Sequence, residues 1–593
     1  GDHRDLHLSI RRQRQMCIRD SIYGSVWHHR MPDRGYFAIF ESYPDLFIER
    51  KHLSVEDFVR YTQCIQAWGY QYVAEEYRRQ KPVKSGFTTW EFNEPWTDFN
   101  WGIIDSELIP KHSFYTFARG CAPALVSARF NCYVWAAESK FHAGIWFSLE
   151  GGQHRHATVR TSACDDHGNI LFEGSYEGWS GGDSIPLGDV SFKVPANGAF
   201  FLKLQAHLDN GQTLDNDYAF TVIPKCDAAP LNILFLSGKV YERHIINEYF
   251  KAAQFVLDER IISPQQPLNP DEINLQKYDA VVLAPVFNPL QSLGDGFFDK
   301  LKKAIHDDGL GFVYFPFNSS AYVSGRFDVD PLCGSVLEEL LPFSFAPNHY
   351  SNSDEHSAQW KILDDPSAQS TAAPWEPRND GLNKVRDHLI WNFINTDIQL
   401  PILSIRVQTA YKNSDDIIGI EGRQPVLGVK QSGKGRIVAF AGPFGGHNFS
   451  QTPFRRWIDA EQLLINLVEY AASGNVSRKV GGHTPLAALA HLPPSKAEIA
   501  AKELERTPEK ISWHISVRNT SPIPLVYFTI ENTSPQEGQV FDWHVSDNYL
   551  LLMPGESKEV HACVTARNNH PLPEHIDLAT SAWNLQARAL KVT

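Results

Sequence analysis

The fold is decided by residues 86–96, whose sequence is Gly86-Phe-Thr-Thr-Trp-Glu-Phe-Asn-Glu-Pro-Trp96. The β-branched and aromatic residues at 87–90 predict a strand, and carboxylate, carboxamide and indole groups follow it. Aromatic faces stack on the C–H faces of sugars, and Asn and Glu side chains form hydrogen bonds with sugar hydroxyls. This order is typical of a barrel strand whose C-terminal end opens into a carbohydrate site. A buried strand followed by an aromatic-rich loop is the alternative interpretation.

The residues before this stretch predict the rest of a barrel unit. Residues 36–41 form a strand signal that ends on a carboxylate, and residues 54–57 have the form of a capping box that opens a helix. Apolar residues then follow at spacings of three and four, which predicts one helical face: Phe58, Tyr61, Ile65, Trp68 and Tyr72. A complete (β/α)8 barrel needs about 250 residues. We therefore expect residues 22–112 to be the C-terminal part of such a barrel, and the chain to be truncated at its start.

The rest of the chain alternates between β-rich and α/β regions. Short alternating runs separated by turns over residues 113–226 predict a β-sandwich. Buried-strand runs alternate with helical stretches over 227–473, which predicts a doubly wound parallel sheet. Residues 474–508 have the composition of a linker, with an Ala/Lys/Glu-rich piece that suggests a helix, and residues 509–593 predict a second sandwich. Residues 1–21 are basic and lack apolar periodicity, so we expect a disordered or artefactual tail, with a basic interaction tail as the alternative.

Composition argues against several classes of function. The chain has 593 residues and a net charge of −14, which does not favour binding to nucleic acid because phosphate contacts need clustered Lys and Arg. No apolar run approaches the roughly 18 residues needed to cross a membrane. The eight cysteines are scattered, with neither a CxxC pair nor a Cys/His metal spacing, so we expect free thiols, no metal and no cofactor. The 15 tryptophans suit a protein that handles sugars. The compartment cannot be read from the sequence.

Three stretches resemble parts of known glycosidases. Residues 86–111 resemble the eighth barrel strand of glycoside hydrolase family 2, in its β-mannosidase-like branch, where the chain leaves the barrel and enters an immunoglobulin-like sandwich. Residues 546–556 and 581–584 resemble the C-terminal sandwich of β-mannosidases and exo-β-glucosaminidases. Residues 227–473 resemble a glutamine-amidotransferase-like, flavodoxin-like domain of the kind that accompanies some glycosidases. An oligomer, if one forms, is expected to use this domain. The strand that ends at residue 315 carries no Cys at its end, so we expect no amidase activity there.

The family resemblance implies a set of site residues. Retaining glycoside hydrolysis uses two carboxyl groups about 5–5.5 Å apart. By this resemblance Glu41 takes the place of the family's nucleophile at the end of the seventh strand, although its flanking residues differ from the family's sequence; a solvated acid at the end of a strand is the alternative. The acid/base residue is expected to be absent from the chain. Glu91 is the weaker candidate for the nucleophile. The resemblance also implies four substrate-binding residues, of which one replaces the family's Asp: Trp90, Asn93, Glu94 and Trp96.

The function implied is that of a C-terminal fragment of a retaining exo-β-glycosidase that hydrolyses terminal β-mannosides or related β-glycosides. Its partner would be an oligosaccharide or glycoside substrate, and neither nucleic acid nor a membrane. The alternative is a non-catalytic carbohydrate-binding or scaffold protein built from the sandwiches and the amidotransferase-like domain.

Overall fold

The computed structural model divides the chain into two compact units. It describes residues 55–84, 86–89, 91–93, 102–106, 108–151, 154–238, 243–286, 288–316, 332–345, 381–396, 400, 409–422, 424–442, 457, 459–481, 486, 488–534, 541–567 and 570–590. The first unit contains the described residues up to 222 and those from 486 onward, and the second contains the described residues between them.

The first unit begins with a long helix, α6 (Val55–Arg79), which packs against α7 (His112–Gly120). The helix predicted from the capping box is therefore present. Ile65 and Trp68 of the predicted apolar face are buried, but Tyr72 is 49% exposed, so the prediction was wrong at that position. The buried face of α6 instead includes the polar residues Gln71 and Glu75, which form hydrogen bonds with the neighbouring sandwich. Tyr72 therefore lies outside this face.

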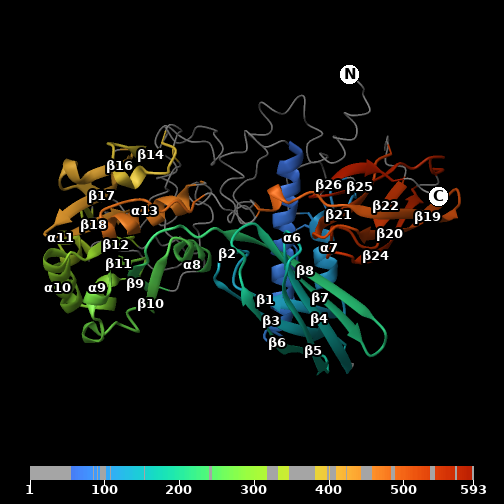
Figure 1. The fold of residues 1–593 in the computed structure, drawn as a ribbon, viewed down its shortest axis with the longest axis horizontal. Helices are drawn as coiled ribbons and strands as arrows, with labels where there is room; N and C mark the ends of the chain where they lie inside the picture. The colour runs from blue at the N-terminus through green and yellow to red at the C-terminus, as the bar shows by residue number, and fades with distance from the viewer. Residues whose placement is uncertain are drawn as a thin grey trace, which may run out of the picture. The chain divides into compact units, whose positions relative to one another are not determined.

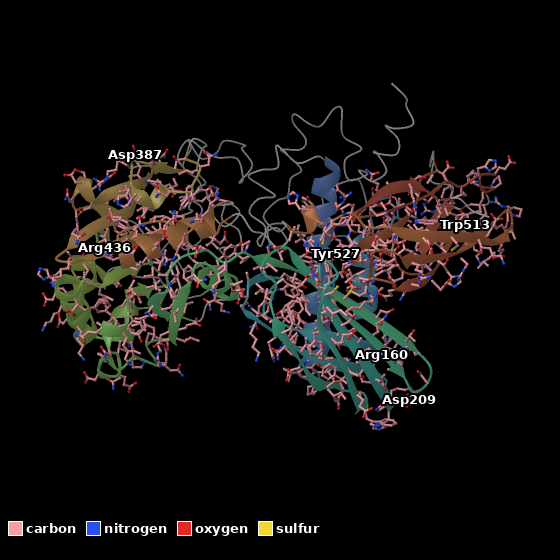
Figure 2. The ribbon with its side chains drawn as sticks, in the orientation of Figure 1. Arg160, Asp209, Asp387, Arg436, Trp513 and Tyr527 are labelled. Atoms are coloured by element: carbon pink, nitrogen blue, oxygen red, sulfur yellow. The ribbon has the colours of Figure 1, made fainter. Side chains whose placement is uncertain are left out.

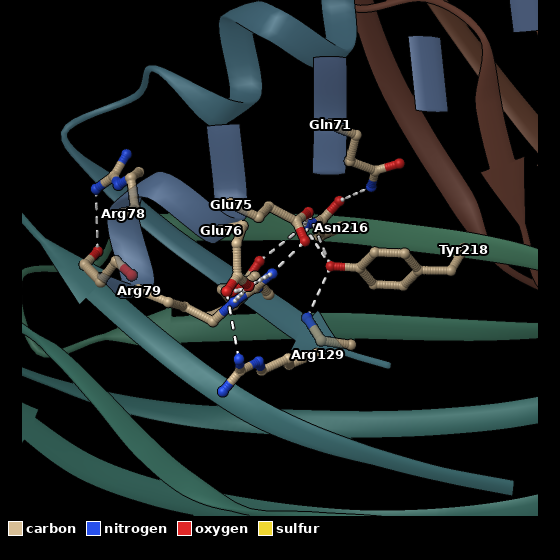
Figure 3. Close-up of polar contacts among 12 residues, drawn as sticks. Gln71, Glu75, Glu76, Arg78, Arg79, Arg129, Asn216 and Tyr218 are labelled. Carbon is tan, nitrogen blue, oxygen red and sulfur yellow. Dashed lines mark hydrogen bonds and ion pairs between the residues drawn. The ribbon is translucent and has the colours of Figure 1, made fainter. Parts of the chain in front are cut away.

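A buried polar network fixes the last turns of α6 to this sandwich (Figure 3). The carboxylate of Glu75 accepts hydrogen bonds from Asn216 Nδ2 at 2.8 Å and from Tyr218 Oη at 2.9 Å, and it pairs with Arg79 at 3.4 Å. Gln71 Nε2 donates to Asn216 Oδ1 at 2.8 Å. Burial raises the pKa of Glu75, and its three donors oppose this shift. A buried charge with this many partners holds one helix orientation, because any shift would leave polar groups without partners.

Residues 86–89 do not form the predicted strand. The ring of Phe87 instead packs edge-on against Tyr77 of α6 and Phe117 of α7, with centroids 5.5 and 5.6 Å away. The backbone of 86–89 has no ladder partner within the described residues, so its β-branched composition alone is not sufficient for a strand. The strand predicted at residues 36–41 lies outside the described residues.

The first sandwich follows α7 directly (Figure 1). Its strands are β1 (Ala124–Arg129), β2 (Val134–Ala136), β3 (Lys140–Leu149), β4 (Arg155–Asp165), β5 (Ile170–Ser180), β6 (Ser184–Lys193), β7 (Ala199–Leu208) and β8 (Thr213–Ile223). They form two sheets, ordered β1-β3-β6 and β2-β8-β7-β4-β5. The phenylalanines Phe141, Phe200 and Phe220 pack against one another between these sheets with centroids 4.7–5.2 Å apart. Burial alternates along most of β3 but is nearly continuous along β7 and the second half of β8, and these strands supply the core.

The C-terminal sandwich belongs to the same unit. Its strands are β19 (Ala497–Arg506), β20 (Lys510–Asn519), β21 (Leu525–Asn532), β22 (Phe541–Val545), β23 (Leu550–Leu552), β24 (Ser557–Ala566), β25 (Leu578–Ala582) and β26 (Leu585–Ala589). The sheets are ordered β19-β20-β24-β22 and β23-β21-β25-β26, and a short 3₁₀ helix, η10 (Leu489–His491), precedes them. Trp513, labelled on this sandwich in Figure 2, is buried in its core.

The predicted linker at 474–508 needs a correction, because strand β19 lies within it. β19 pairs with β20 along its length and forms an edge of the sheet. Ala497 and Ala501 are buried while Glu498 and Lys502 are exposed, so the segment has the two-residue period of a strand and not the period of the suggested helix. Charged residues on an edge strand also discourage pairing with other chains.

The second unit contains a mixed eight-stranded sheet with the order β10-β9-β11-β12-β18-β17-β16-β14. Its elements in chain order are β9 (Leu231–Ser237), α8 (Arg243–Ala252), β10 (Phe255–Ile261), η2 (Pro270–Glu272), η3 (Leu275–Lys277), β11 (Ala280–Leu283), α9 (Pro289–Leu293), α10 (Asp295–Lys303), η4 (Ala304–Asp308), β12 (Gly311–Tyr314), α11 (Val336–Leu340), β13 (Phe343–Phe345), β14 (Leu382–Lys384), η6 (Leu389–Trp391), β15 (Thr409–Tyr411), η7 (Ser414–Asp416), β16 (Ile417–Glu421), β17 (Gln424–Ser432), β18 (Gly435–Phe440) and α13 (Ala460–Ser473). Strands β13 and β15 form a separate small sheet.

Parallel pairing joins β10, β9, β11, β12 and β18, whereas β17, β16 and β14 are added in antiparallel fashion. The sheet is therefore only partly the parallel sheet that the sequence predicted. Helix α13 packs against β12 and β18, and both strands are fully buried or nearly so. Burial of this kind explains why their sequences are continuous apolar runs.

Candidate active site

The predicted site residues fall mostly outside the described part of the chain. Glu41, Trp90, Glu94 and Trp96 all lie outside the described residues, so their roles stay predictions. Asn93 is described, and its side chain is exposed. The site can therefore be built outward from Asn93 and the backbone that holds it.

Asn93 belongs to a short segment that we call the strap, which comprises the described residues 91–93, 102–106 and 108–111. The amides of Ile103 and Ile104 both donate to the carbonyl of Phe92, at 3.1 and 3.2 Å. Asn93 forms a parallel β-bridge with Ile104. An exposed carboxamide on a backbone held in this way can offer both a donor and an acceptor to a ligand.

The strap is tied to the two helices through buried polar contacts. Gln66 of α6 donates to the carbonyl of Gly102 at 3.5 Å and accepts a hydrogen bond from Ser113 Oγ of α7 at 2.8 Å. Ile103 is fully buried, and the amide of Lys111 donates to its carbonyl at 3.0 Å. Gln66 thus ties the strap to α6 and is itself held by α7.

The two described carboxylates of the strap have different environments. Asp105 Oδ1 accepts the amide of Ile109 at 2.8 Å, so this carboxylate closes a turn. Glu91, the weaker nucleophile candidate, is exposed and has a left-handed backbone with φ of 67°. A non-glycine residue in that region costs of order 1–3 kcal/mol and is kept where surrounding contacts or function require it. The Glu91 side chain is therefore open to solvent in the described part of the strap.

Metal binding finds no support in the described residues, which contain no group of three or more His, Cys, Asp or Glu placed to hold an ion. The described helices likewise include none that is long and apolar enough to cross a membrane.

A separate cavity of about 400 Å³ lies at one end of the first sandwich, away from the strap in sequence. Its polar lining includes Glu150, Arg155 and Asn210, and the described residues that line it include no aromatic side chain. It therefore lacks the stacking surface that the sequence predicts for the carbohydrate site.

The sequence interpretation missed Gln66 and Ser113, which anchor the strap. The signal was present, because Gln66 is a polar residue between the apolar Ile65 and Ala67, and all three are buried. A polar residue on a buried helical face requires a partner. The partner itself, the carbonyl of Gly102, is 36 residues away and could not be identified from spacing.

Comparisons with known proteins connect parts of the chain to glycosidases. Residues 475–585 match the family model of the exo-β-D-glucosaminidase Ig-fold domain. The β-mannosidase B of Aspergillus flavus is 31% identical over 90 residues, which are 15% of this chain and 11% of that protein. The β-mannosidase B of Aspergillus terreus is 30% identical over 111 residues, 17% of this chain and 13% of that protein. The chain thus spans only about a tenth of the length of these curated relatives.

Among solved structures, the exo-chitosanase CsxA of Amycolatopsis orientalis aligns with a TM-score of 0.41 at 10% identity, covering 92% of this chain and 36% of that chain. The β-D-mannosidase of Dictyoglomus thermophilum aligns with a TM-score of 0.25 at 17% identity, covering 30% of this chain and 22% of that chain. The family-model match and the two sequence relatives thus each link a short part of the chain to glycosidases.

Proposed function

We propose that this chain is part of a retaining exo-β-glycosidase that hydrolyses terminal β-mannosides or related β-glycosides, including β-glucosaminides. The observation that carries the proposal is the match of residues 475–585 to the Ig-fold domain of exo-β-D-glucosaminidases. The short β-mannosidase matches support the same class of substrate. Residues 486–585 of the described chain lie in the same compact unit as Asn93, the described member of the predicted substrate site.

The domain arrangement is part of the proposal. Residues 22–112 are assigned to the end of a catalytic barrel, 113–226 to an immunoglobulin-like sandwich, and 227–473 to a flavodoxin-like, amidotransferase-like domain. Support for the last assignment comes from the order β10-β9-β11-β12-β18 of the parallel strands, which corresponds to the flavodoxin-like order 2-1-3-4-5. Residues 1–21 are assigned to no domain.

In the proposed mechanism, the Glu41 carboxylate attacks the anomeric carbon and the bond to the leaving oxygen breaks. A second carboxyl group, not identified in this chain, would protonate that oxygen, and water would then hydrolyse the glycosyl–enzyme ester. The Asn93 carboxamide would form a hydrogen bond with a hydroxyl of the bound sugar. Such bonds orient the substrate for attack.

The experiment that tests the nucleophile uses a reagent that needs no acid catalyst. Dinitrophenolate leaves without a proton, so 2,4-dinitrophenyl 2-deoxy-2-fluoro-β-mannoside should form a stable ester on the nucleophile even when the acid/base is absent. Peptide mass spectrometry should locate the added sugar on Glu41. The Glu41→Gln variant should not be labelled, whereas the matched variant Glu91→Gln should be labelled like the wild type.

Two results would contradict the proposal, the first in its choice of nucleophile and the second in its chemistry. An ester on Glu91 or on any other carboxylate would remove Glu41 from its role. If calorimetry shows that the protein binds the β-mannoside but no ester forms, the result would favour the alternative function of a non-catalytic carbohydrate-binding protein.

A further inference from the structure

The histidine that directly follows the strap is enclosed by two tyrosines of the C-terminal sandwich. His112 is the first residue of α7 and is only 3% exposed. Its ring stacks on Tyr549 with centroids 4.3 Å apart and planes at 9°, and it meets Tyr527 at 4.9 Å and 63°. Burial lowers the pKa of His112 well below its ordinary value, so a neutral imidazole occupies this position at neutral pH.

Both tyrosines have an unfavourable backbone conformation. The φ angles of Tyr527 and Tyr549 are 52° and 58°, in the left-handed region that large side chains rarely adopt. Other contacts hold these conformations in place. Asn548 Oδ1 accepts the amide of Ile530 at 2.9 Å, and Trp68 Nε1 of α6 donates to Tyr527 Oη at 2.8 Å. Such conformations persist where the surrounding structure fixes them, and they mark sites where a side chain has to be placed accurately.

The same stretch of the sandwich also holds the other end of α7. Arg119 Nη1 lies 2.9 Å from Asp547 Oδ1, two positions before Tyr549 in the chain. Residues 546–556 therefore contact α7 at both its first and its last turn. This is the segment whose sequence resembles β-mannosidases.

A short path of backbone contacts leads from His112 to Asn93. The amide of Lys111, next to His112, donates to the carbonyl of Ile103 at 3.0 Å. Ile104 forms bridges with Pro110 on one side and with Asn93 on the other. A shift of His112 would be transmitted to Asn93 because each step is a direct backbone pairing.

We propose that Tyr527 and Tyr549 form a clamp on His112, through which the C-terminal sandwich positions the strap and its Asn93 carboxamide. His112 and the two tyrosines are positioning residues in this proposal. The positioning of the strap by the clamp does not depend on whether the protein hydrolyses glycosides. Only the binding of a sugar by Asn93 rests on the proposed function.

Hydrogen exchange of the strap amides tests the clamp directly in the full chain. Tyr549→Ala removes the stacked ring and should speed exchange of the Ile103, Ile104 and Lys111 amides at least tenfold. Tyr549→Phe keeps the ring and should leave these amides as in the wild type. Val560→Ala, in the buried core of the same sandwich, is the matched control for lost stability and should also leave them unchanged.

The clamp proposal is wrong if Tyr549→Ala leaves the strap amides protected from exchange. It is also wrong if Val560→Ala speeds the exchange of these amides equally. The second result would show that general loosening of the sandwich, and not the ring, controls the strap.

Labelling with the fluoro-mannoside provides the second readout. If the wild type is labelled on Glu41, then Tyr549→Ala and Asn93→Ala should each raise the reagent concentration at half-maximal labelling about tenfold. The double variant should be no worse than either one, because residues that act through one contact are not additive. Additive effects would overturn the clamp while leaving the glycosidase proposal intact. If the wild type is not labelled, the proposed function is wrong. The hydrogen exchange of the strap amides then decides by itself whether the clamp positions the strap.

Discussion

Lys203 Nζ lies 2.5 Å from Glu556 Oε1, and this ion pair joins β7 of the first sandwich to the C-terminal sandwich. Lys203 is 4% exposed at its side chain and also donates to the carbonyl of Leu551 at 2.6 Å. Gln205 Nε2 donates to the same carboxylate oxygen at 2.9 Å. A desolvated pair with these additional partners fixes how the two sandwiches meet within the first unit.

Replacing Lys203 by Met should lower the free energy of unfolding of the first unit by about 2 kcal/mol, because Glu556 is left as a poorly paired buried charge. Urea denaturation followed by tryptophan fluorescence measures this. Lys193→Met is the matched control, since Lys193 and Glu138 pair at 2.9 Å with side chains 69% and 48% exposed; its cost should be under about 0.5 kcal/mol. Equal losses in the two variants would contradict the assignment of a structural role to the Lys203 pair.

Asp217 should make the first unit less stable as the pH rises. Burial raises the pKa of Asp217 from 3.8 to about 6, although Arg119 and Lys203 oppose the shift. The folded state then holds this proton more tightly than the unfolded state does, so stability falls as the pH rises from about 4 to about 6. Asp217→Asn should therefore gain on the order of 1 kcal/mol at pH 7.5 and nothing at pH 4.5.

Urea midpoints at the two pH values check this prediction. Asp183→Asn removes an exposed carboxylate from the same sandwich and serves as the control. A gain for Asp217→Asn that is the same at both pH values would show that the proton is not involved.

Asn519 should tolerate neither Ala nor Asp. Its Nδ2 donates to the carbonyls of Ile523, Leu552 and Met553 at 2.8, 3.0 and 3.2 Å, and the residue is fully buried. An ionised Asp has no donor, so Asn519→Asp should cost at least as much as Asn519→Ala, about 3 kcal/mol. At the exposed turn residue Asn210, only the acceptor is used, on the amide of Gln212 at 3.0 Å. Asn210→Asp should thus leave the melting temperature within about 1 °C of the wild type. A tolerated Asn519→Asp would mean that the three carbonyls are satisfied in another way.

Gly311 should not accept a methyl group in the second unit. A Cβ there would lie 2.4 Å from the carbonyl oxygen of Ala471 in α13, so Gly311→Ala has to push α13 away from β12. The expected cost is about 1–3 kcal/mol. Gly296 of α10 has no atom within 4 Å of its Cβ position, and Gly296→Ala should be neutral or stabilising by about 0.5 kcal/mol. Thermal denaturation of both variants decides whether the α13 contact is as close as the structure has it.

Local sequence patterns predicted some elements well and others poorly. The helix α6 was predicted from its capping box and apolar spacing because these signals act within one or two turns. The strand predicted at 86–90 failed over its described residues because a strand also requires a neighbour, and Phe87 found helical partners instead. Strand β19 was missed because an edge strand rich in Ala, Glu and Lys resembles a helix in composition.

For the candidate site, the sequence supplied residue types and a family resemblance, whereas the structure supplied the anchoring of the one described residue. The resemblance pointed to Asn93, and the contacts of Gln66 and Ser113 that hold its segment came only from the fold. These contacts join residues 36 and 47 positions apart, a separation at which no periodic pattern carries information.

The sequence by itself determined the order of the elements in this protein, together with the alternation of β-rich and α/β regions, because periodicity and turn chemistry are properties of neighbouring residues. Only the tertiary structure decided what residues 546–556 do. Asp547, Tyr549 and Glu556 each contact a different partner, namely Arg119, His112 and Lys203. Those partners are brought together by the packing of separate sandwiches and helices. A charge or a ring gains its role there because burial removes the competing water, and burial depends on the whole fold.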